Sequence, residues 1–255
     1  MGSTRREFLE LGALAALGGA LGTSPSRLRL PARSRIKAVA FDGFPVIDPR
    51  PVAARAEELF PGRGAELMNA WRTRQFEYTW LRTLSHQYAD FWHVTEEALR
   101  FAAKSLKLEL PGETRDRLLG TYLELKAWPD VAPALKALKA AGIRMAFLSN
   151  FTAPMLDAAL KNASLDGFFE PHLSTDRVRA YKPDPRAYQM GLDAFKLKRD
   201  EVAFAASAGW DVAGAAWFGY PTIWINRMDQ PAEELGVAPA ATGRDLRDLV
   251  AFVGA

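Results

Sequence analysis

Four short apolar segments recur along the chain, separated by longer stretches with helical periodicity. The segments are residues 36–41, 143–148, 201–206 and 221–226. Apolar runs of this length are typical of strands that are buried on both faces of a parallel sheet. Strands that alternate with helices form such a sheet through right-handed crossovers. The sequence therefore predicts an α/β fold with a Rossmann-like parallel sheet as its core.

Polar side chains follow three of these segments at the point where each strand is expected to end. Asp42 follows the first, Ser149 and Asn150 follow the second, and residues 207–211 follow the third. In open parallel sheets, ligands bind outside the carboxyl ends of the strands. We therefore expect these side chains to converge at one edge of the sheet and to form a site there.

A long insertion separates the first two predicted strands. Residues 50–128 have helical periodicity and few strand signals. We interpret this insertion as a helical cap on a core formed by residues 33–49 and 129–255. A chain of 255 residues, 49% of them hydrophobic, is long enough to bury a core and a cap of this size.

The N-terminus resembles a twin-arginine export signal. Arg5 and Arg6 precede an apolar run from Leu11 to Leu21. That run is too short to remain as a membrane anchor, which needs about 20 apolar residues. We therefore predict that residues 1–32 are a signal and linker, and that the protein is periplasmic or otherwise exported, without a stable membrane anchor. A frayed amphipathic helix is the alternative, because the segment has no clear Ala-x-Ala cleavage site.

Composition excludes several classes of chemistry. The sequence has no cysteine, which rules out disulfides, thiol nucleophiles and thiolate metal sites. The net charge is only +3, and the basic residues are scattered rather than gathered into a stripe. We therefore expect no nucleic-acid partner.

Residues 69–82 read Asn-Ala-Trp-Arg-Thr-Arg-Gln-Phe-Glu-Tyr-Thr-Trp-Leu-Arg, a set of side chains that helix packing alone does not require. This run resembles the cap-helix signature of the bacterial 2-haloacid dehalogenases. Residues 218–227 resemble the same branch, whereas Asp42 after its strand and the Tyr-Lys-Pro-Asp segment at 181–184 resemble the wider haloacid dehalogenase (HAD) superfamily. The resemblance covers the chain from about residue 35 onward, and it implies the HAD fold with an inserted cap.

The resemblance implies hydrolytic dehalogenation of small 2-haloacids to 2-hydroxy acids through an aspartyl ester. Asp42 would attack the α-carbon, and Lys182 beside it would favour the ionised carboxylate. Arg72 from the cap and Asn150 from the core would bind the departing halide, because negative charge develops on that atom. Asp211 would orient or deprotonate the water that hydrolyses the ester.

Other residues are expected to bind or surround the substrate. Ser149, together with backbone N–H groups after Asp42, would hold the substrate carboxylate, and Tyr188 would support it with a hydrogen bond. An apolar pocket should enclose the α-carbon substituent, because excluding water strengthens electrostatic interactions. The candidates for this pocket are Phe44, Phe76, Phe91 and Trp210.

The residue two positions after Asp42 distinguishes reaction classes within the superfamily. Phosphatases of the superfamily carry a second aspartate there, which acts as a general acid and helps to bind Mg²⁺. This chain has Phe44, which cannot protonate a leaving alcohol. We therefore disfavour phosphoryl transfer and predict that the site needs no metal and no cofactor.

The chain departs from the family pattern near the nucleophile and near the hydrolytic water. Val46 replaces a threonine, and Ala206 and Ala208 replace a serine and an asparagine. Pro45 replaces a glycine and removes an N–H group from the loop after Asp42. Hydrolysis of the ester is therefore the half-reaction that the sequence supports least.

Two other functions stay open at this point. One is a non-dehalogenating relative that binds or processes another small carboxylate, and the other is a superfamily phosphatase. The helical cap resembles the L-specific branch of the dehalogenases. Its aromatic side chains also suggest a surface for a homodimer.

Overall fold

A sheet of six parallel strands forms the centre of the structure, in the order β3-β2-β1-β4-β5-β6. The computed structural model describes residues 35–255. The strands are β1 (Ala38–Phe41), β2 (Arg144–Ser149), β3 (Leu173–Ser174), β4 (Val202–Ala206), β5 (Thr222–Ile225) and β6 (Ala241–Gly243). The predicted α/β fold with a parallel sheet is confirmed.

The sequence predicts four of these strands, β1, β2, β4 and β5, and misses the two at the sheet edges. Strand β3 has two residues and β6 has three. Segments this short give no usable periodicity, because a strand signal needs about 4–8 residues.

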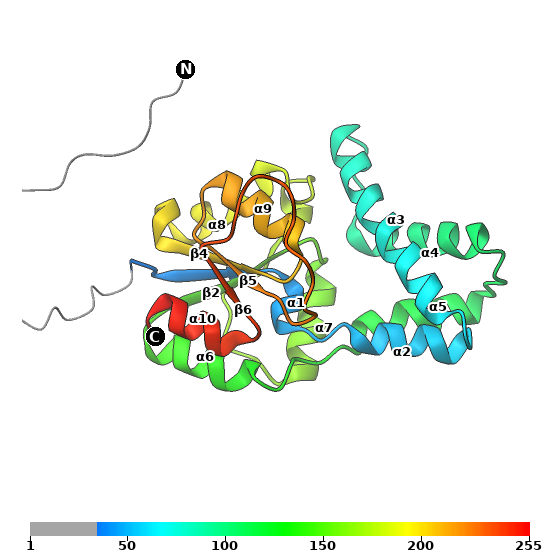
Figure 1. Cartoon of the computed structure of the whole chain (residues 1–255), viewed down its shortest axis with the longest axis horizontal. Coiled ribbons are helices and arrows are strands. Elements are labelled where there is room, and N and C mark those ends of the chain that lie inside the picture. The colour runs from blue at the N-terminus through cyan, green and yellow to red at the C-terminus, as the bar shows by residue number, and fades with distance from the viewer. Residues whose placement is uncertain (1–34) are drawn as a thin grey trace, which may run out of the picture. The chain divides into compact units, whose positions relative to one another are not determined.

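The side chains of β1 alternate between two hydrophobic cores, as the pleat of a strand requires. Val39 and Phe41 belong to one core, and Ala38 and Ala40 belong to the other. The helices that cover the sheet are α6 (Val131–Ala140), α7 (Ala153–Ala163), α8 (Pro185–Phe195), α9 (Gly209–Phe218) and α10 (Leu246–Val253). Figure 1 shows α6 and α10 on one side of the sheet and α8 and α9 on the other. Both faces are thus buried, which leaves the strand ends as the place for a site.

The insertion after β1 is helical, and the predicted helical cap is confirmed. Its helices are α2 (Arg50–Leu59), α3 (Gly64–Leu84), α4 (Phe91–Ser105), α5 (Gly112–Gly120) and the short 3-10 helix η1 (Thr121–Leu123). Trp71 of α3 donates from Nε1 to the carbonyl of Thr95 in α4 at 2.8 Å, and Gln75 donates to the Thr95 hydroxyl at 2.6 Å. Part of the aromatic and polar run at 69–82 therefore holds the two longest cap helices together.

The chain enters and leaves the cap through two adjacent segments. Ile47 and Ala127 form an antiparallel bridge. The N–H of Asp48 donates to the carbonyl of Lys126 at 2.8 Å, and the N–H of Trp128 donates to Val46 at 3.1 Å. The entry segment follows helix α1 (Gly43–Val46), which begins directly after Asp42. The domain boundaries predicted from the sequence, residues 33–49 and 129–255 for the core and 50–128 for the cap, stay a prediction.

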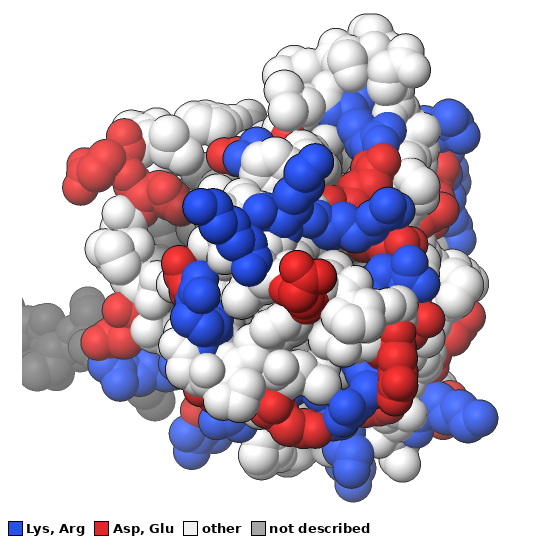
Figure 2. All heavy atoms as spheres, turned by 90° about the vertical axis from the view of Figure 1, so that its right-hand side faces the viewer, with Lys and Arg blue, Asp and Glu red and all other residues white. Residues whose placement is uncertain are grey.

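The charged surface of the cap face carries both signs. Figure 2 shows Lys and Arg side chains lying beside Asp and Glu side chains on this face. The ion pairs include Arg117 with Glu58 at 2.7 Å and Arg115 with Glu96 at 3.4 Å.

Two predictions concern membranes and export. Within residues 35–255, no helix combines the length and the apolar character needed to cross a membrane. The predicted twin-arginine signal, residues 1–32, lies outside the described residues.

Candidate active site

Three charged side chains meet at the carboxyl ends of the strands. The ammonium group of Lys182 lies 2.7 Å from Asp42 Oδ1 and 2.5 Å from Asp211 Oδ2. Asp42 is the first residue after β1 and the N-cap of α1, whereas Asp211 lies in the first turn of α9. The side chains of Lys182 and Asp211 are each 1% exposed, but that of Asp42 is 13% exposed. Asp42 is therefore the carboxylate of this group that a substrate can reach.

The electrostatics of the group follow from one ammonium shared by two carboxylates. Burial would lower the pKa of Lys182, but Asp211 and Asp42 more than offset it, so the pKa is raised and the lysine stays charged. Burial raises the pKa of Asp211 to about 6, against the effect of Lys182 and with a further contribution from Asp42. Asp211 is therefore ionised at neutral pH and can accept a proton.

Tyr188 donates a hydrogen bond to Oδ1 of Asp211, whereas Lys182 contacts Oδ2 of the same carboxylate. The Tyr188 hydroxyl donates to Asp211 Oδ1 at 2.7 Å, and burial together with Asp211 raises its pKa well above the ordinary value. A Cβ atom at Gly214 would lie 2.5 Å from the Tyr188 hydroxyl, so only glycine lets α8 and α9 approach closely enough for this bond. Tyr188 thus supports Asp211 directly.

Ser149 and Asn150, at the end of β2, lie beside the loop after Asp42. A Cβ atom on Gly43 would lie 3.5 Å from Ser149 Oγ, which shows how closely the two segments approach. Ser149 is 1% exposed and Asn150 is 5% exposed. Asn150 Oδ1 accepts from the N–H of Lys182 at 3.1 Å, so its NH₂ group is the end that can donate to a ligand.

Phe151, which the sequence did not nominate as a site residue, contacts both Phe44 and Phe91. Phe151 lies edge to face with Phe44 at 5.3 Å between ring centroids, and 5.5 Å from Phe91 of the cap. The signal available for Phe151 was its place directly after Asn150. These three rings join the segment after Asp42, the end of β2 and the cap.

Phe76 and Trp210 form a second aromatic contact between cap and core. Their ring centroids are 5.1 Å apart, and Trp80 lies 5.6 Å from Trp210. Within residues 35–255, Trp80 Nε1 is buried and has no hydrogen-bond partner. Trp80 was also missed as a site candidate, although its spacing of four residues from Phe76 places both on one helix face.

Arg72 is exposed on α3, and its guanidinium lies 6.0 Å from the centre of the Phe76 ring. In the described part of the chain it makes no ion pair within 4.0 Å. Its charge is therefore available to an anion beside the Phe76 and Trp210 rings.

Comparison with known proteins assigns the chain to a family. Residues 32–219 match the model of the haloacid dehalogenase-like hydrolases. The chain is 42% identical over 216 residues to (S)-2-haloacid dehalogenase of Pseudomonas sp. (strain YL), which covers 84% of this chain and 93% of that protein. The chain belongs to the 2-haloacid dehalogenase family. The resemblance and the hydrolase class predicted from sequence are confirmed.

Solved structures of 2-haloacid dehalogenases have the same fold. The crystal structure of an L-2-haloacid dehalogenase has a TM-score of 0.84 and 44% identity, covering 86% of this chain and 99% of the other. The L-2-haloacid dehalogenase of Xanthobacter autotrophicus, solved with chloropropionic acid covalently bound, has a TM-score of 0.79 and 33% identity, covering 86% and 98%.

Two of the departures from the 2-haloacid dehalogenase pattern, Val46 and Ala206, are buried, whereas Ala208 is partly exposed. Val46 and Ala206 are fully inaccessible. Ala208 is the N-cap of α9 and gives it no side-chain hydrogen bond. Among the described residues, the Ser207 hydroxyl is buried without a partner. Polar groups around Asp211 are thus fewer than the family pattern predicts.

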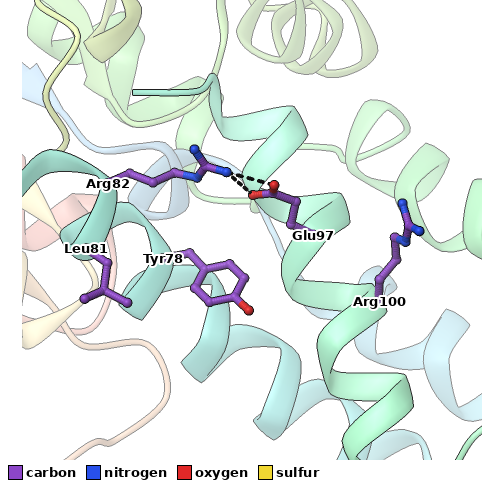
Figure 3. Close-up of a pocket in the computed structure, with 5 residues that line it drawn as sticks. All are labelled: Tyr78, Leu81, Arg82, Glu97 and Arg100. Atoms are coloured by element: carbon purple, nitrogen blue, oxygen red, sulfur yellow. Dashed lines mark hydrogen bonds and ion pairs between the residues drawn. The ribbon is translucent and has the colours of Figure 1, made fainter. Parts of the chain in front are cut away.

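A separate hollow of about 410 Å³ lies between α3 and α4 of the cap. Figure 3 shows Arg82 reaching Glu97 across it, with Tyr78, Leu81 and Arg100 around them. None of the predicted site residues lines this hollow. In residues 35–255, no group of three or more His, Asp or Glu side chains is arranged to hold a metal ion.

Proposed function

We propose that this protein hydrolyses small L-2-haloacids to 2-hydroxy acids through an ester formed on Asp42. The observation that carries the proposal is the placement of Asp42, partly exposed at a strand end and 2.7 Å from the buried ammonium of Lys182. Phe44 follows at the position where a phosphatase needs an acid. The names of the similar proteins, (S)- and L-2-haloacid dehalogenases, support the same reaction.

In the first half-reaction, a carboxylate oxygen of Asp42 attacks the α-carbon of the substrate. The carbon–halogen bond breaks, the halide leaves with its electron pair, and an ester joins Asp42 to the substrate carbon. The ammonium of Lys182, 2.7 Å from Asp42 Oδ1, holds the attacking carboxylate in place. Arg72 and the NH₂ group of Asn150 bind the halide as charge develops on it, and Ser149 holds the substrate carboxylate.

In the second half-reaction, water attacks the Asp42 carbonyl carbon. The bond between that carbon and the ester oxygen breaks, which releases the 2-hydroxy acid and regenerates the Asp42 carboxylate. Asp211 accepts the proton from the attacking water, since its pKa of about 6 leaves it ionised at neutral pH, and then gives it to the departing ester oxygen, which becomes the product hydroxyl. The Asp42 carboxyl group formed in this step releases its own proton to solvent. Lys182 and Tyr188 hold Asp211 in place at 2.5 and 2.7 Å.

Halide release from the L and D enantiomers of 2-chloropropionate tests this function. We expect release from the L enantiomer, and no release above background from Asp42→Asn. Equal release by the wild type and Asp42→Asn would show that Asp42 is not the nucleophile. No release from either enantiomer between about pH 7 and 10 would contradict the function.

A second candidate is a protein that binds a small carboxylate without turning it over. The apolar side chains of Val46, Ala206 and Ala208 favour it, because they remove polar groups from the surroundings of the hydrolytic water. Calorimetric binding of lactate or propionate, combined with no halide release in the first turnover, would support this candidate over the first.

We also propose that the protein is exported through the twin-arginine pathway. The support is the sequence alone, with Arg5 and Arg6 ahead of an apolar run. The test is cell fractionation of the wild type and a variant with both arginines changed to lysine. Periplasmic wild type and cytoplasmic variant are expected, and cytoplasmic location of both would contradict the proposal.

We further propose a homodimer formed through α3 and α4. The support is the exposure of large apolar side chains on these two helices: Leu81 is 57% exposed, Leu84 79% and Phe101 41%. Light scattering should give twice the chain mass for the wild type and a lower mass for Leu84→Glu. A monomeric wild type at high protein concentration would contradict the proposal.

A further inference from the structure

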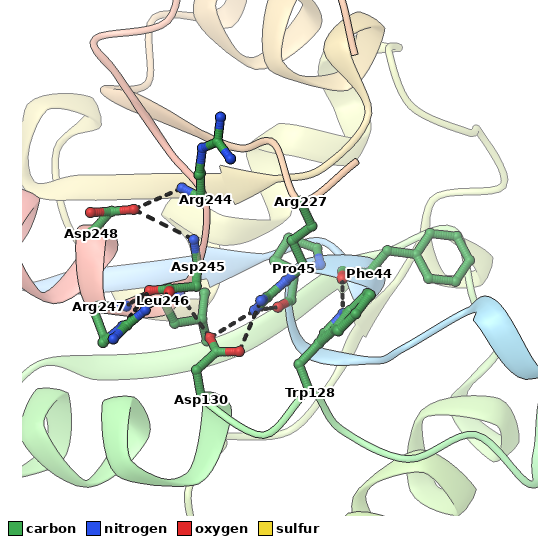
Figure 4. A network of polar contacts seen from close by, with 10 residues as sticks. All are labelled: Phe44, Pro45, Trp128, Asp130, Arg227, Arg244, Asp245, Leu246, Arg247 and Asp248. Carbon is green, nitrogen blue, oxygen red and sulfur yellow. Dashed lines mark hydrogen bonds and ion pairs between the residues drawn. The ribbon is translucent and has the colours of Figure 1, made fainter. Parts of the chain in front are cut away.

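Two side chains hold the backbone of the loop that follows Asp42, whose residues 43–46 form the single turn of α1. Trp128 donates from Nε1 to the carbonyl of Phe44 at 3.1 Å, and Arg227 donates from Nη2 to the carbonyl of Pro45 at 2.8 Å. Figure 4 shows both donors directed at these two successive carbonyl groups. The donors lie 84 and 182 residues away from their acceptors along the chain.

Asp130 fixes Arg227 in this orientation. The two groups form a bidentate pair, Nη1 to Oδ1 and Nη2 to Oδ2, both at 2.8 Å. The N–H of Leu246, at the start of α10, also donates to Asp130 at 2.9 Å. Burial would raise the pKa of Asp130, but these hydrogen bonds lower it, so the carboxylate stays ionised. The Arg227 side chain is only 8% exposed, which leaves it little freedom to move.

Trp128 connects this network to both segments that join cap and core. The guanidinium of Arg227 lies 4.7 Å from the centre of the Trp128 ring, and that of Arg50, the first residue of α2, lies 4.5 Å from it. The N–H of Trp128 donates to the carbonyl of Val46 at 3.1 Å. Carbonyl groups of three successive loop residues are therefore held by residues 128 and 227.

We propose that Arg227 and Trp128 are positioning residues for the displacement by Asp42, an inference that rests on the proposed function. Peptide planes are rigid, so holding the carbonyls of Phe44 and Pro45 fixes the orientation of the loop, including the Val46 N–H on the opposite side of its peptide plane. Asp42 begins this loop, and its carboxylate accepts from the N–H of Phe44. Neither Arg227 nor Trp128 touches the carboxylate; they act through the backbone.

The chain offers a matched control for Arg227. Arg144 forms a bidentate pair with Glu170 at 2.6 and 2.8 Å, donates to the carbonyl of Phe195 at 2.6 Å, and lies 5.1 Å from the Phe195 ring. It thus makes the same three kinds of contact as Arg227. Arg144 begins β2, at the amino ends of the strands, whereas Asp42 lies at the carboxyl ends.

The test compares four variants of the full chain: Arg227→Gln, Arg227→Lys, Trp128→Phe and Arg144→Gln. The measurements are the rate of halide release in the first turnover at saturating L-2-chloropropionate, the half-saturating concentration and the melting temperature. Trp128→Phe keeps a smaller aromatic ring and removes the N–H donor, so it remains informative if Arg227→Gln fails to fold.

We expect Trp128→Phe and Arg227→Gln to slow the first turnover by about tenfold or more, because small displacements of a reacting group cost up to about 100-fold. The half-saturating concentration should change by less than about twofold, since no substrate contact is lost. Arg227→Lys should recover part of the rate, and Arg144→Gln should stay within about twofold of the wild type even where its melting temperature falls.

Two results would overturn the inference while leaving the proposed function intact. One is halide release by the wild type together with unchanged rates for Trp128→Phe and Arg227→Gln. The other is an equal loss of rate in Arg144→Gln, which would show that the slower rates come from lower stability and not from a displaced loop. Absence of release by the wild type would overturn the proposed function, and this inference with it.

Discussion

Lys182 and Asp211 form an ion pair at 2.5 Å in which each side chain is only 1% exposed. Buried pairs of this kind add little net stability when intact, because both charges have lost their water. Removing one partner is costly, since it leaves the other charge buried without compensation. Here the lysine also compensates Asp42, so its removal would leave two carboxylates facing each other.

Lys182→Met should therefore destabilise the protein by about 3–5 kcal/mol and abolish measurable halide release. Urea unfolding measures the first effect and a first-turnover assay the second. Lys139→Met is the control, because Lys139 is exposed, donates to the carbonyl of Gly167 and lies 5.5 Å from the centre of the Phe168 ring, with no carboxylate beside it among the described residues. A Lys182→Met variant as stable as the wild type would show that the buried pair is absent in solution.

The pH dependence of turnover should follow the ionisation of Asp211. Burial raises its pKa from 3.8 to about 6, and only the ionised form can accept a proton from water. Steady-state turnover should therefore fall as the pH drops through about 6, while ester formation on Asp42 persists below that pH. Rates of first-turnover and steady-state halide release, measured between about pH 5 and 8, check this. Loss of both rates in parallel would assign the ionisation to another group.

Tyr188→Phe should shift that loss of turnover to higher pH. The Tyr188 hydroxyl lowers the pKa of Asp211 by donating to its carboxylate, so removing the hydroxyl raises that pKa further. The variant keeps the ring and its packing in the core that also contains Ala38 and Ala40. The measurement is the pH at which steady-state turnover falls to half of its maximum on the acid side. A shift of that pH to a lower value would contradict the role assigned to Tyr188.

Ala208→Asn should stabilise the protein and speed ester hydrolysis. Ala208 caps α9 with extended backbone geometry but no side-chain bond, and asparagine in place of alanine at such a position stabilises by about 1 kcal/mol. It would also return an amide to the surroundings of Asp211. Urea unfolding and steady-state turnover measure the two effects. Thr152→Ala, which removes the side-chain cap of α7, should lose a similar amount of stability without affecting hydrolysis.

A structural feature of this protein could be predicted from the sequence where residues adjacent in the chain form a pattern that indicates it. Strands β1 and β2 were predictable because each is a buried apolar run that ends at a polar residue. Asp42 was predictable from that strand end, whereas Lys182 was nominated only by resemblance. Trp71 and Gln75 belong to the same run as Arg72, but they pack α3 against α4.

The contacts around Trp128 and Arg227 could not be predicted in the same way. The two bonds to Phe44 and Pro45 join residues 84 and 182 positions apart, and their acceptors are backbone carbonyls, which carry no sequence information. The role of Phe151 likewise depends on how the cap meets the core. Three-dimensional placement alone reveals these residues.

The central claim is that the ester forms on Asp42 and is cleaved at the Asp42 carbonyl. A single turnover of L-2-chloropropionate, with enzyme in excess, in water enriched in the heavy isotope of oxygen tests it most directly. The account predicts that the heavy atom enters the Asp42 carboxylate, detected by mass spectrometry of the peptide that contains it, and that the first lactate formed carries no label. Lactate labelled in the first turnover, with an unlabelled Asp42, would mean that water attacks the substrate directly and would contradict the account.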